Sequence, residues 1–170
     1  MHFPPGVPVV IVNYKIYAEA SGKRAVAFTQ ALQRAAQGKR VALAVAPQAA
    51  DLHRVASACE LPLLAQHVDS LAAGNGTGAT LVDSIADAGA TGSILNHAER
   101  RLSLAEIDAA CARLAKAGLM RVVCTDSVRT TRAAASLGPE FVAIEPPELI
   151  GGDISVTTAD PEIVRLAVQA

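Results

Sequence analysis

Short apolar runs and longer amphipathic stretches alternate along the chain. The apolar runs are rich in Val, Ile, Leu and Ala, and they lack a polar residue at every second position. Strands that are apolar on both faces are typical of a parallel sheet covered by helices. The pattern therefore predicts strands at residues 9–15, 41–46, 62–66, 92–96, 121–124 and 141–145.

The stretches between these runs have helical spacing and helical end signals. Ser103 and Glu106 have the spacing of a capping box, which marks the start of a helix. Four glycines stand where helices should end, at Gly38, Gly89, Gly118 and Gly138. We predict helices at residues 21–37, 49–58, 81–88, 103–117, 127–137 and 160–170.

Six β–α units thus follow one another, with no Pro- or Gly-rich linker between them, and residues 1–170 are expected to form a single α/β domain. Such alternation fits either an open doubly wound sheet or a closed barrel. The first strand is followed by Asn13-Tyr14-Lys15, where a dinucleotide-binding fold would have a Gly-x-Gly-x-x-Gly turn.

The composition of the chain argues against several kinds of binding partner and site. The net charge is −1 and no basic run is present, which argues against nucleic acid or an anionic membrane as a partner. The apolar runs are too short to span a bilayer, and the first residues do not resemble a signal peptide. The three cysteines fit neither a disulfide framework nor a zinc motif, and we expect a cytoplasmic protein with free thiols. His67 and Asp69 have no third ligand near them, so no metal site is expected.

Polar residues collect where the predicted strands end. Asn13 and Lys15 follow the first strand, His97 and Glu99 the fourth, and Glu145 ends the sixth. Taken singly, each has an ordinary explanation: a solvated charge, a hydrogen-bonded histidine, or an ion pair at the start of a helix. Parallel α/β folds bring the carboxyl ends of their strands to one rim. Together these residues offer a positive charge, a hydrogen-bond donor and a base, which suits removal of a proton next to a carbonyl.

Six local strings carry a family resemblance. "VNYKIY", "AQHVD", "GTG", "LNHAERR", "GLMRVVC" and "IEPPELIG" occur in this order. From about residue 7 to its end, the chain resembles the triosephosphate isomerase family in its short, archaeal-type branch. The resemblance implies a TIM-barrel (βα)8-type fold. It also implies interconversion of dihydroxyacetone phosphate and D-glyceraldehyde 3-phosphate, a step of glycolysis and gluconeogenesis, without cofactor or metal.

The resemblance also implies catalytic roles, which belong to the family and are carried over by position. Asn13 and Lys15 match substrate contacts, and Lys15 matches the catalytic lysine. His97 matches the neutral histidine that polarises the carbonyl, and Glu145 matches the base that moves the proton between adjacent carbons.

Further matched positions surround this centre. Glu99 would hold Lys15, and Arg100 would fix the same loop by charge pairing. Gly151 would offer its amide to the substrate phosphate. Thr77 would be the tip of a loop that reaches a neighbouring subunit, which implies a homo-oligomer, either a dimer or a tetramer. A mobile lid would comprise Pro146, Pro147, Glu148, Leu149 and Ile150.

The sequence departs from the family pattern in three places. Ala98 stands where the family commonly has serine, and Gly152-Asp153 stands where it has Thr-Gly. The family folds as eight βα units, whereas about six are predicted here, so the last two units and their phosphate-binding loops are expected to be missing. Residues 9–12 would then present an apolar strand edge.

Three interpretations remain open from the sequence. The chain is an isomerase that completes itself by assembling with other copies, or it needs a second fragment, or it is an inactive homologue that self-associates or binds a partner. The first two predict isomerase activity that depends on Glu145. The third predicts a folded protein without turnover.

Overall fold

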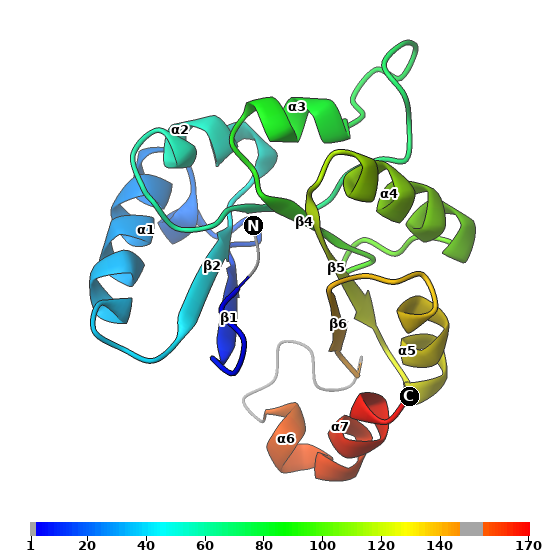
Figure 1. Cartoon of the computed structure of the whole chain (residues 1–170). Coiled ribbons are helices and arrows are strands. Elements are labelled where there is room, and N and C mark those ends of the chain that lie inside the picture. Colours follow the sequence, from blue (N-terminus) through cyan, green and yellow to red (C-terminus); the bar gives the residue numbers. More distant parts are fainter. Residues whose placement is uncertain (1–2, 147–154) are drawn as a thin grey trace.

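A computed structural model describes residues 3–146 and 155–170, and its strands form a curved, all-parallel arc (Figure 1). The strands are β1 (Val9–Asn13), β2 (Ala42–Ala46), β3 (Leu64–Ala65), β4 (Gly92–Leu95), β5 (Met120–Thr125) and β6 (Phe141–Ile144). β1 pairs with β2, β3 to β6 pair in sequence order, and a parallel bridge between Val45 and Leu63 links the two sets. This order is that of a (βα) barrel, because a doubly wound sheet reverses its strand order at a switch point.

The first five helices cover the outside of the arc, and the last two lie at its opening, beyond the end of β6 (Figure 1). They are α1 (Lys23–Ala36), α2 (Leu52–Ala56), α3 (Val82–Asp87), α4 (Leu104–Lys116), α5 (Val128–Ala135), α6 (Val156–Ala159) and α7 (Pro161–Val168), with 3₁₀ turns η1 (Ala18–Ala20) and η2 (Ala49–Asp51). The capping box of Ser103 and Glu106 begins α4, as predicted. After α4 and α5, Gly118 and Gly138 take φ values of 69° and 67°, the left-handed conformation that ends a helix. No described helix combines the length and the apolar composition needed to cross a bilayer.

Several predicted boundaries differ from the structure. The first and fourth strands end at Asn13 and Leu95, because Lys15 and Asn96 adopt positive φ and turn the chain out of the sheet. The strand predicted at 62–66 is reduced to two residues, and Leu63 before it makes only an isolated bridge to Val45. The helix predicted at 49–58 is divided into η2 and α2, and α6 was not predicted.

Two apolar layers hold the arc together. Neighbouring residues of one strand face opposite layers: Ile94 and Val122 face inward, whereas Leu95 and Val123 pack against the helices. Each fully buried Leu or Val contributes roughly 1.5–3 kcal/mol relative to exposure. The inner layer is assembled from strand residues, including Ala46, Leu64, Met120 and Cys124, together with Phe3, whose ring packs edge-on against Phe141 with centroids 5.8 Å apart.

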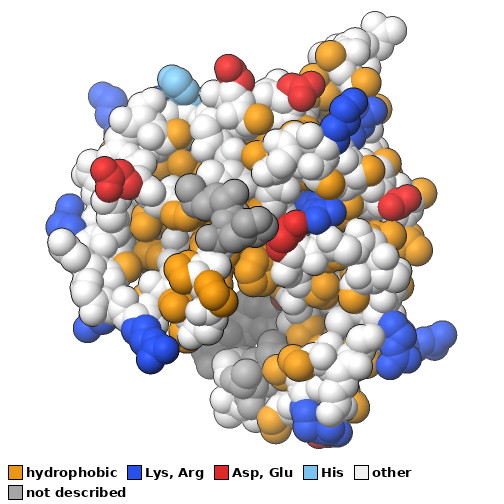
Figure 2. Space-filling model, viewed as in Figure 1, with side chains coloured by type: hydrophobic (Ala, Val, Ile, Leu, Met, Phe, Trp, Pro, Cys, Tyr) orange, Lys and Arg blue, Asp and Glu red, His pale blue; other side chains and the backbone are white. Residues whose placement is uncertain are grey.

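The two ends of the arc are the strands β1 and β6. Within the described residues, β1 pairs only with β2 and β6 only with β5, and Val10 on β1 is 45% exposed. On the face of the molecule that Figure 2 shows, apolar side chains gather in the middle, whereas most charged side chains lie toward the periphery. The expected apolar edge at β1 is thus present in this part of the chain.

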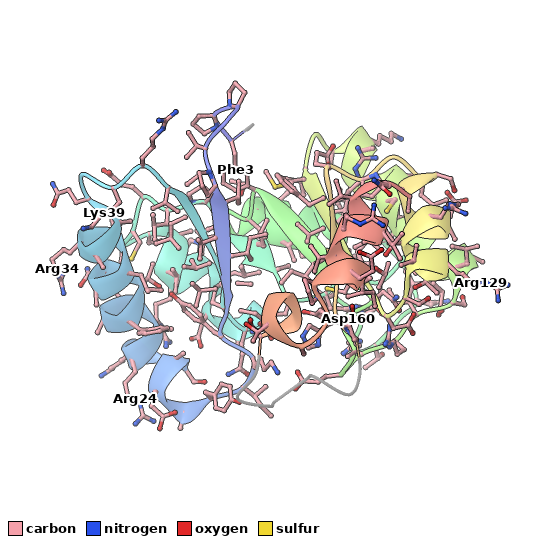
Figure 3. The ribbon with its side chains drawn as sticks, turned by 90° about the horizontal axis from the view of Figure 1, so that it is seen from below. Phe3, Arg24, Arg34, Lys39, Arg129 and Asp160 are labelled. Carbon is pink, nitrogen blue, oxygen red and sulfur yellow. The ribbon has the colours of Figure 1, made fainter. Side chains whose placement is uncertain are left out.

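Asp160 lies between α6 and α7 (Figure 3) and caps α7 by accepting a hydrogen bond from the Ile163 amide.

Candidate active site

A pocket of about 520 Å³ opens at the carboxyl ends of the strands. A pocket of this size falls within the range of small-molecule sites, about 300–1,000 Å³. Its lining includes Asn13, Lys15, Gln66, His67, His97 and Glu99, which end or follow β1, β3 and β4. Glu145, which follows β6, approaches this group through its contact with His97.

Lys15 is held at three points. Its amide donates to Asn13 Oδ1 at 2.9 Å, and its carbonyl accepts from Gln66 Nε2 at 2.8 Å. Its ammonium Nζ lies 3.0 Å from Glu99 Oε1. The φ of Lys15 is 45°, a left-handed conformation that side-chain-bearing residues rarely adopt and that costs about 1–2 kcal/mol. The surrounding hydrogen bonds therefore fix this lysine in an otherwise unfavourable conformation.

His97 is 9% exposed, and its two ring nitrogens have different surroundings. The Glu99 amide donates to His97 Nδ1 at 3.1 Å, so Nδ1 acts as an acceptor. The Glu99 carboxylate is farther from Nδ1, at 3.6 Å, and is engaged by Lys15. The proton of a neutral imidazole then lies on Nε2, and that atom is directed toward Glu145.

Asn96 makes the turn that presents His97. Its φ is 58°, a value that asparagine tolerates better than most residues. Its side chain donates to the Cys124 carbonyl at 2.9 Å and accepts from the Leu102 amide at 2.8 Å. These bonds tie the end of β4 to β5 and to the start of the following helix.

Glu145 begins the segment after β6, and its amide donates to the Thr125 carbonyl at 2.6 Å. Its Oε2 lies 3.7 Å from His97 Nε2, is buried, and has no hydrogen-bond partner among residues 3–146 and 155–170. Burial, and secondarily the negative charge of Glu145, raise the pKa of the neighbouring Cys124 thiol. The thiol therefore stays protonated and adds no charge beside the carboxylate.

The remaining predicted residues lie farther from this centre. Arg100 lines the pocket, but its Nη2 is 3.8 Å from Asp69 Oδ1 and its side chain is 61% exposed, so its charge pairing is weak. Thr77 is exposed on the loop that projects beyond α3 and α4 (Figure 1). Pro146 is fully buried after Glu145. The predicted lid residues 147–150, Gly151 and the 152–153 departure lie outside the described residues.

Two residues of the site were given no role from the sequence. Gln66 and Asn96 each directly follow a buried strand, which places them at the rim, but the carbonyl oxygens that they bind come from distant segments of the chain. Within the described part of the chain, no group of three or more His, Cys, Asp or Glu side chains is placed to hold a metal ion.

Comparisons with known proteins bear on the family and the fold. The family model described as triosephosphate isomerase matches residues 8–170. The triosephosphate isomerase of Methanothermobacter thermautotrophicus is 48% identical over 163 residues, which cover 96% of this chain and 71% of that protein. The enzyme of Methanosarcina acetivorans is 47% identical over 165 residues, covering 97% of this chain and 74% of that protein.

Among solved structures, the triosephosphate isomerase from Bartonella henselae superposes with a TM-score of 0.67. The match covers 82% of this chain and 68% of that one at 21% sequence identity, so it bears on the fold alone. It confirms the predicted fold class, here with the strands of part of a TIM barrel. The family model and the two relatives from Methanothermobacter and Methanosarcina establish the family as well as the fold: the chain belongs to the triosephosphate isomerase family.

Proposed function

We propose that the chain interconverts dihydroxyacetone phosphate and D-glyceraldehyde 3-phosphate by proton transfer between adjacent carbons. One observation carries the proposal: Glu145 Oε2 lies 3.7 Å from the Nε2 of His97, and His97 lines the same pocket as Lys15. This arrangement supplies a base, a hydrogen-bond donor and a positive charge around a space for a small carbonyl compound.

Glu145 is the base in this proposal. Its Oε2 has no hydrogen-bond donor among the described residues, so its lone pairs are free to take a proton from the carbon next to the carbonyl. The pair of electrons from the broken C–H bond moves onto the carbonyl oxygen and gives an enediolate. The hydroxyl proton on the second oxygen passes to the first oxygen, between the two oxygens that His97 Nε2 would face. Glu145 then returns its proton to the neighbouring carbon, and the electrons re-form a carbonyl at the second oxygen.

His97 and Lys15 stabilise the negative charge of the enediolate. Because His97 Nδ1 accepts a backbone hydrogen bond, the Nε2 proton of the neutral ring is the one available to the substrate oxygen. The Lys15 ammonium supplies the positive charge, and its side chain is only 25% exposed, so water screens that charge less than on an open surface. Asn13 and the Gly151 amide are proposed to contact the substrate, the latter at the phosphate.

A second copy of the chain is proposed to complete the pocket, as a dimer or tetramer. Ile16 and Tyr17 line the pocket and are 82% and 62% exposed, which is unusual for large apolar side chains. The exposed loop that carries Thr77 projects from the body of the molecule (Figure 1), so a partner's loop is a suitable occupant.

Turnover of D-glyceraldehyde 3-phosphate by the purified chain tests the function, beside a Glu145→Gln variant of matched shape. We expect turnover from the unaltered chain and a loss of at least about 100-fold in the variant, since a general base contributes about 10²–10⁴-fold. Absence of turnover from a folded chain would reject the proposal for this chain and favour the alternatives: an inactive homologue that self-associates or binds a partner, or a chain that needs a second fragment.

A further inference from the structure

Gln66 lies directly after β3 and shares the pocket with Lys15 and His97. Its side-chain Nε2 donates to the Lys15 carbonyl oxygen at 2.8 Å and to the Ala46 carbonyl oxygen at 3.0 Å. Since both partners are carbonyl oxygens, the amide nitrogen must face them, and the orientation of the Gln66 side chain is determined by its contacts.

Lys15 requires such support because its backbone is in a conformation that L-residues avoid. Its φ of 45° persists only where surrounding contacts over-determine it. The Asn13 side chain holds the Lys15 amide and Gln66 holds the Lys15 carbonyl, so hydrogen bonds engage the residue on both sides of its Cα. Within the described residues, no donor other than Gln66 reaches the Lys15 carbonyl.

The backbone conformation of Lys15 decides where its side chain starts. A return to φ near −60° would redirect the Cα–Cβ bond and carry the ammonium away from the pocket. The ion pair with Glu99, at 3.0 Å, constrains only the far end of a long and flexible side chain. The hydrogen bond from Gln66 to the Lys15 carbonyl therefore constrains the Lys15 backbone, which the ion pair with Glu99 does not.

We propose that Gln66 is a positioning residue: through the Lys15 backbone it sets where the ammonium meets the charge that develops on the substrate. The inference rests on the proposed function for its effect on catalysis. Its structural part stands apart from turnover, because it concerns the conformation of Lys15. A displacement of about 1 Å in a catalytic group costs roughly 100-fold in rate.

The test uses three variants of the full chain. Gln66→Met keeps a similar length and volume without a donor, and Gln66→Glu places a carboxylate against two carbonyl oxygens. Gln48→Met is the matched control, because Gln48 follows β2 and donates to Ser21 Oγ at 2.7 Å and not to the Lys15 carbonyl. The ¹³Cα and ¹³Cβ chemical shifts of Lys15 report its backbone conformation. Steady-state kinetics give kcat and KM, and titration with glycerol 3-phosphate, which has no carbonyl to turn over, gives binding.

We expect the Lys15 shifts to leave their left-handed values in Gln66→Met, and further in Gln66→Glu, while Gln48→Met leaves them in place. kcat/KM should fall roughly 100-fold in Gln66→Met, with weaker binding of glycerol 3-phosphate. If Gln66→Met does not fold, Gln66→Asn, which is one methylene shorter, carries the same expectations. Unchanged Lys15 shifts in a folded Gln66 variant would overturn the inference. Failure of the unaltered chain to turn over substrate would reject the proposed function, and the Lys15 shifts would still decide the role of Gln66.

Discussion

Replacing Glu140 by glutamine tests how the start of β6, the strand that leads to Glu145, is fixed to β5. Glu140 Oε2 accepts from the Arg121 amide at 2.7 Å and from Arg121 Nε at 3.0 Å, and Oε1 accepts from Nη2 at 2.5 Å. These hydrogen bonds from Arg121 outweigh the opposing effect of burial and hold the pKa of Glu140 at about 2, below its ordinary value of 4.5.

The two pKa values set an upper limit on the stabilisation. At about 1.36 kcal/mol per pKa unit, a fall from 4.5 to about 2 corresponds to about 3.4 kcal/mol. The Glu140 side chain is 29% exposed, so solvent screening reduces that value. We expect Glu140→Gln to lower the free energy of unfolding by about 1–2 kcal/mol near neutral pH.

The pH dependence gives the effect a signature. Because the folded pKa lies below the unfolded one, the stabilisation is complete above pH 4.5 and is lost as the pH falls toward about 2. With these values, about three fifths of the difference between the two proteins should be gone near pH 3. Urea unfolding of both proteins between about pH 7 and 3 measures it, with Glu162→Gln in the exposed pair with Arg165 as a control expected to change little. A difference that stays constant down to about pH 3 would refute the reasoning.

Two further predictions concern packing and assembly. A Cβ at Gly92 would lie 2.5 Å from the Met120 carbonyl oxygen and 2.8 Å from Leu64 Cδ2, so Gly92→Ala should lower the free energy of unfolding by about 1–3 kcal/mol in urea titrations; an unchanged midpoint would contradict the close packing of β4. Thr77→Arg places a long charged side chain on the projecting loop, and sedimentation velocity should show a shift from oligomer toward monomer. An unaltered chain that sediments as a monomer would count against the proposed association.

The parts of the fold that depend on local signals were predictable from the sequence. The capping box at Ser103 and the glycines after α4 and α5 act within a few residues, and the structure has α4 beginning and both helices ending at these signals. The apolar runs likewise located the six strands of the described residues, because burial on both faces requires apolar residues wherever a strand lies.

The ends of two strands were not predictable, because distant residues determine them. Lys15 is turned out of the sheet with the help of Gln66, and Asn96 with the help of the Cys124 carbonyl, each far along the chain. Each strand therefore ends earlier than its sequence pattern predicts, at the residue where such a contact turns the backbone. The roles of Gln66 and Asn96 could not be predicted for the same reason: each depends on a carbonyl oxygen supplied by another strand or loop.

The arrangement of His97 and Glu145 followed from the family resemblance more than from spacing. The two residues are far apart in sequence, and the parallel strands β4 and β6 bring their ends to the same rim. Taken singly, His97 and Glu145 each have an ordinary explanation in the sequence. Only the common rim of a parallel arc places the imidazole Nε2 beside an unpaired, buried carboxylate oxygen within the described residues.

Isomerisation in D₂O tests the central claim most directly, because it follows the proton that Glu145 is proposed to move. The purified chain is given D-glyceraldehyde 3-phosphate, and the product is examined for deuterium at the carbon that receives the proton. We expect product that carries solvent deuterium, because the proton held by Glu145 exchanges with solvent before it is returned, and loss of that product in Glu145→Gln. Deuterated product that forms at an unchanged rate in Glu145→Gln would contradict the proposal, because another group would then be the base. Product without deuterium from the unaltered chain would show that the proton returns to the carbon before it exchanges with solvent.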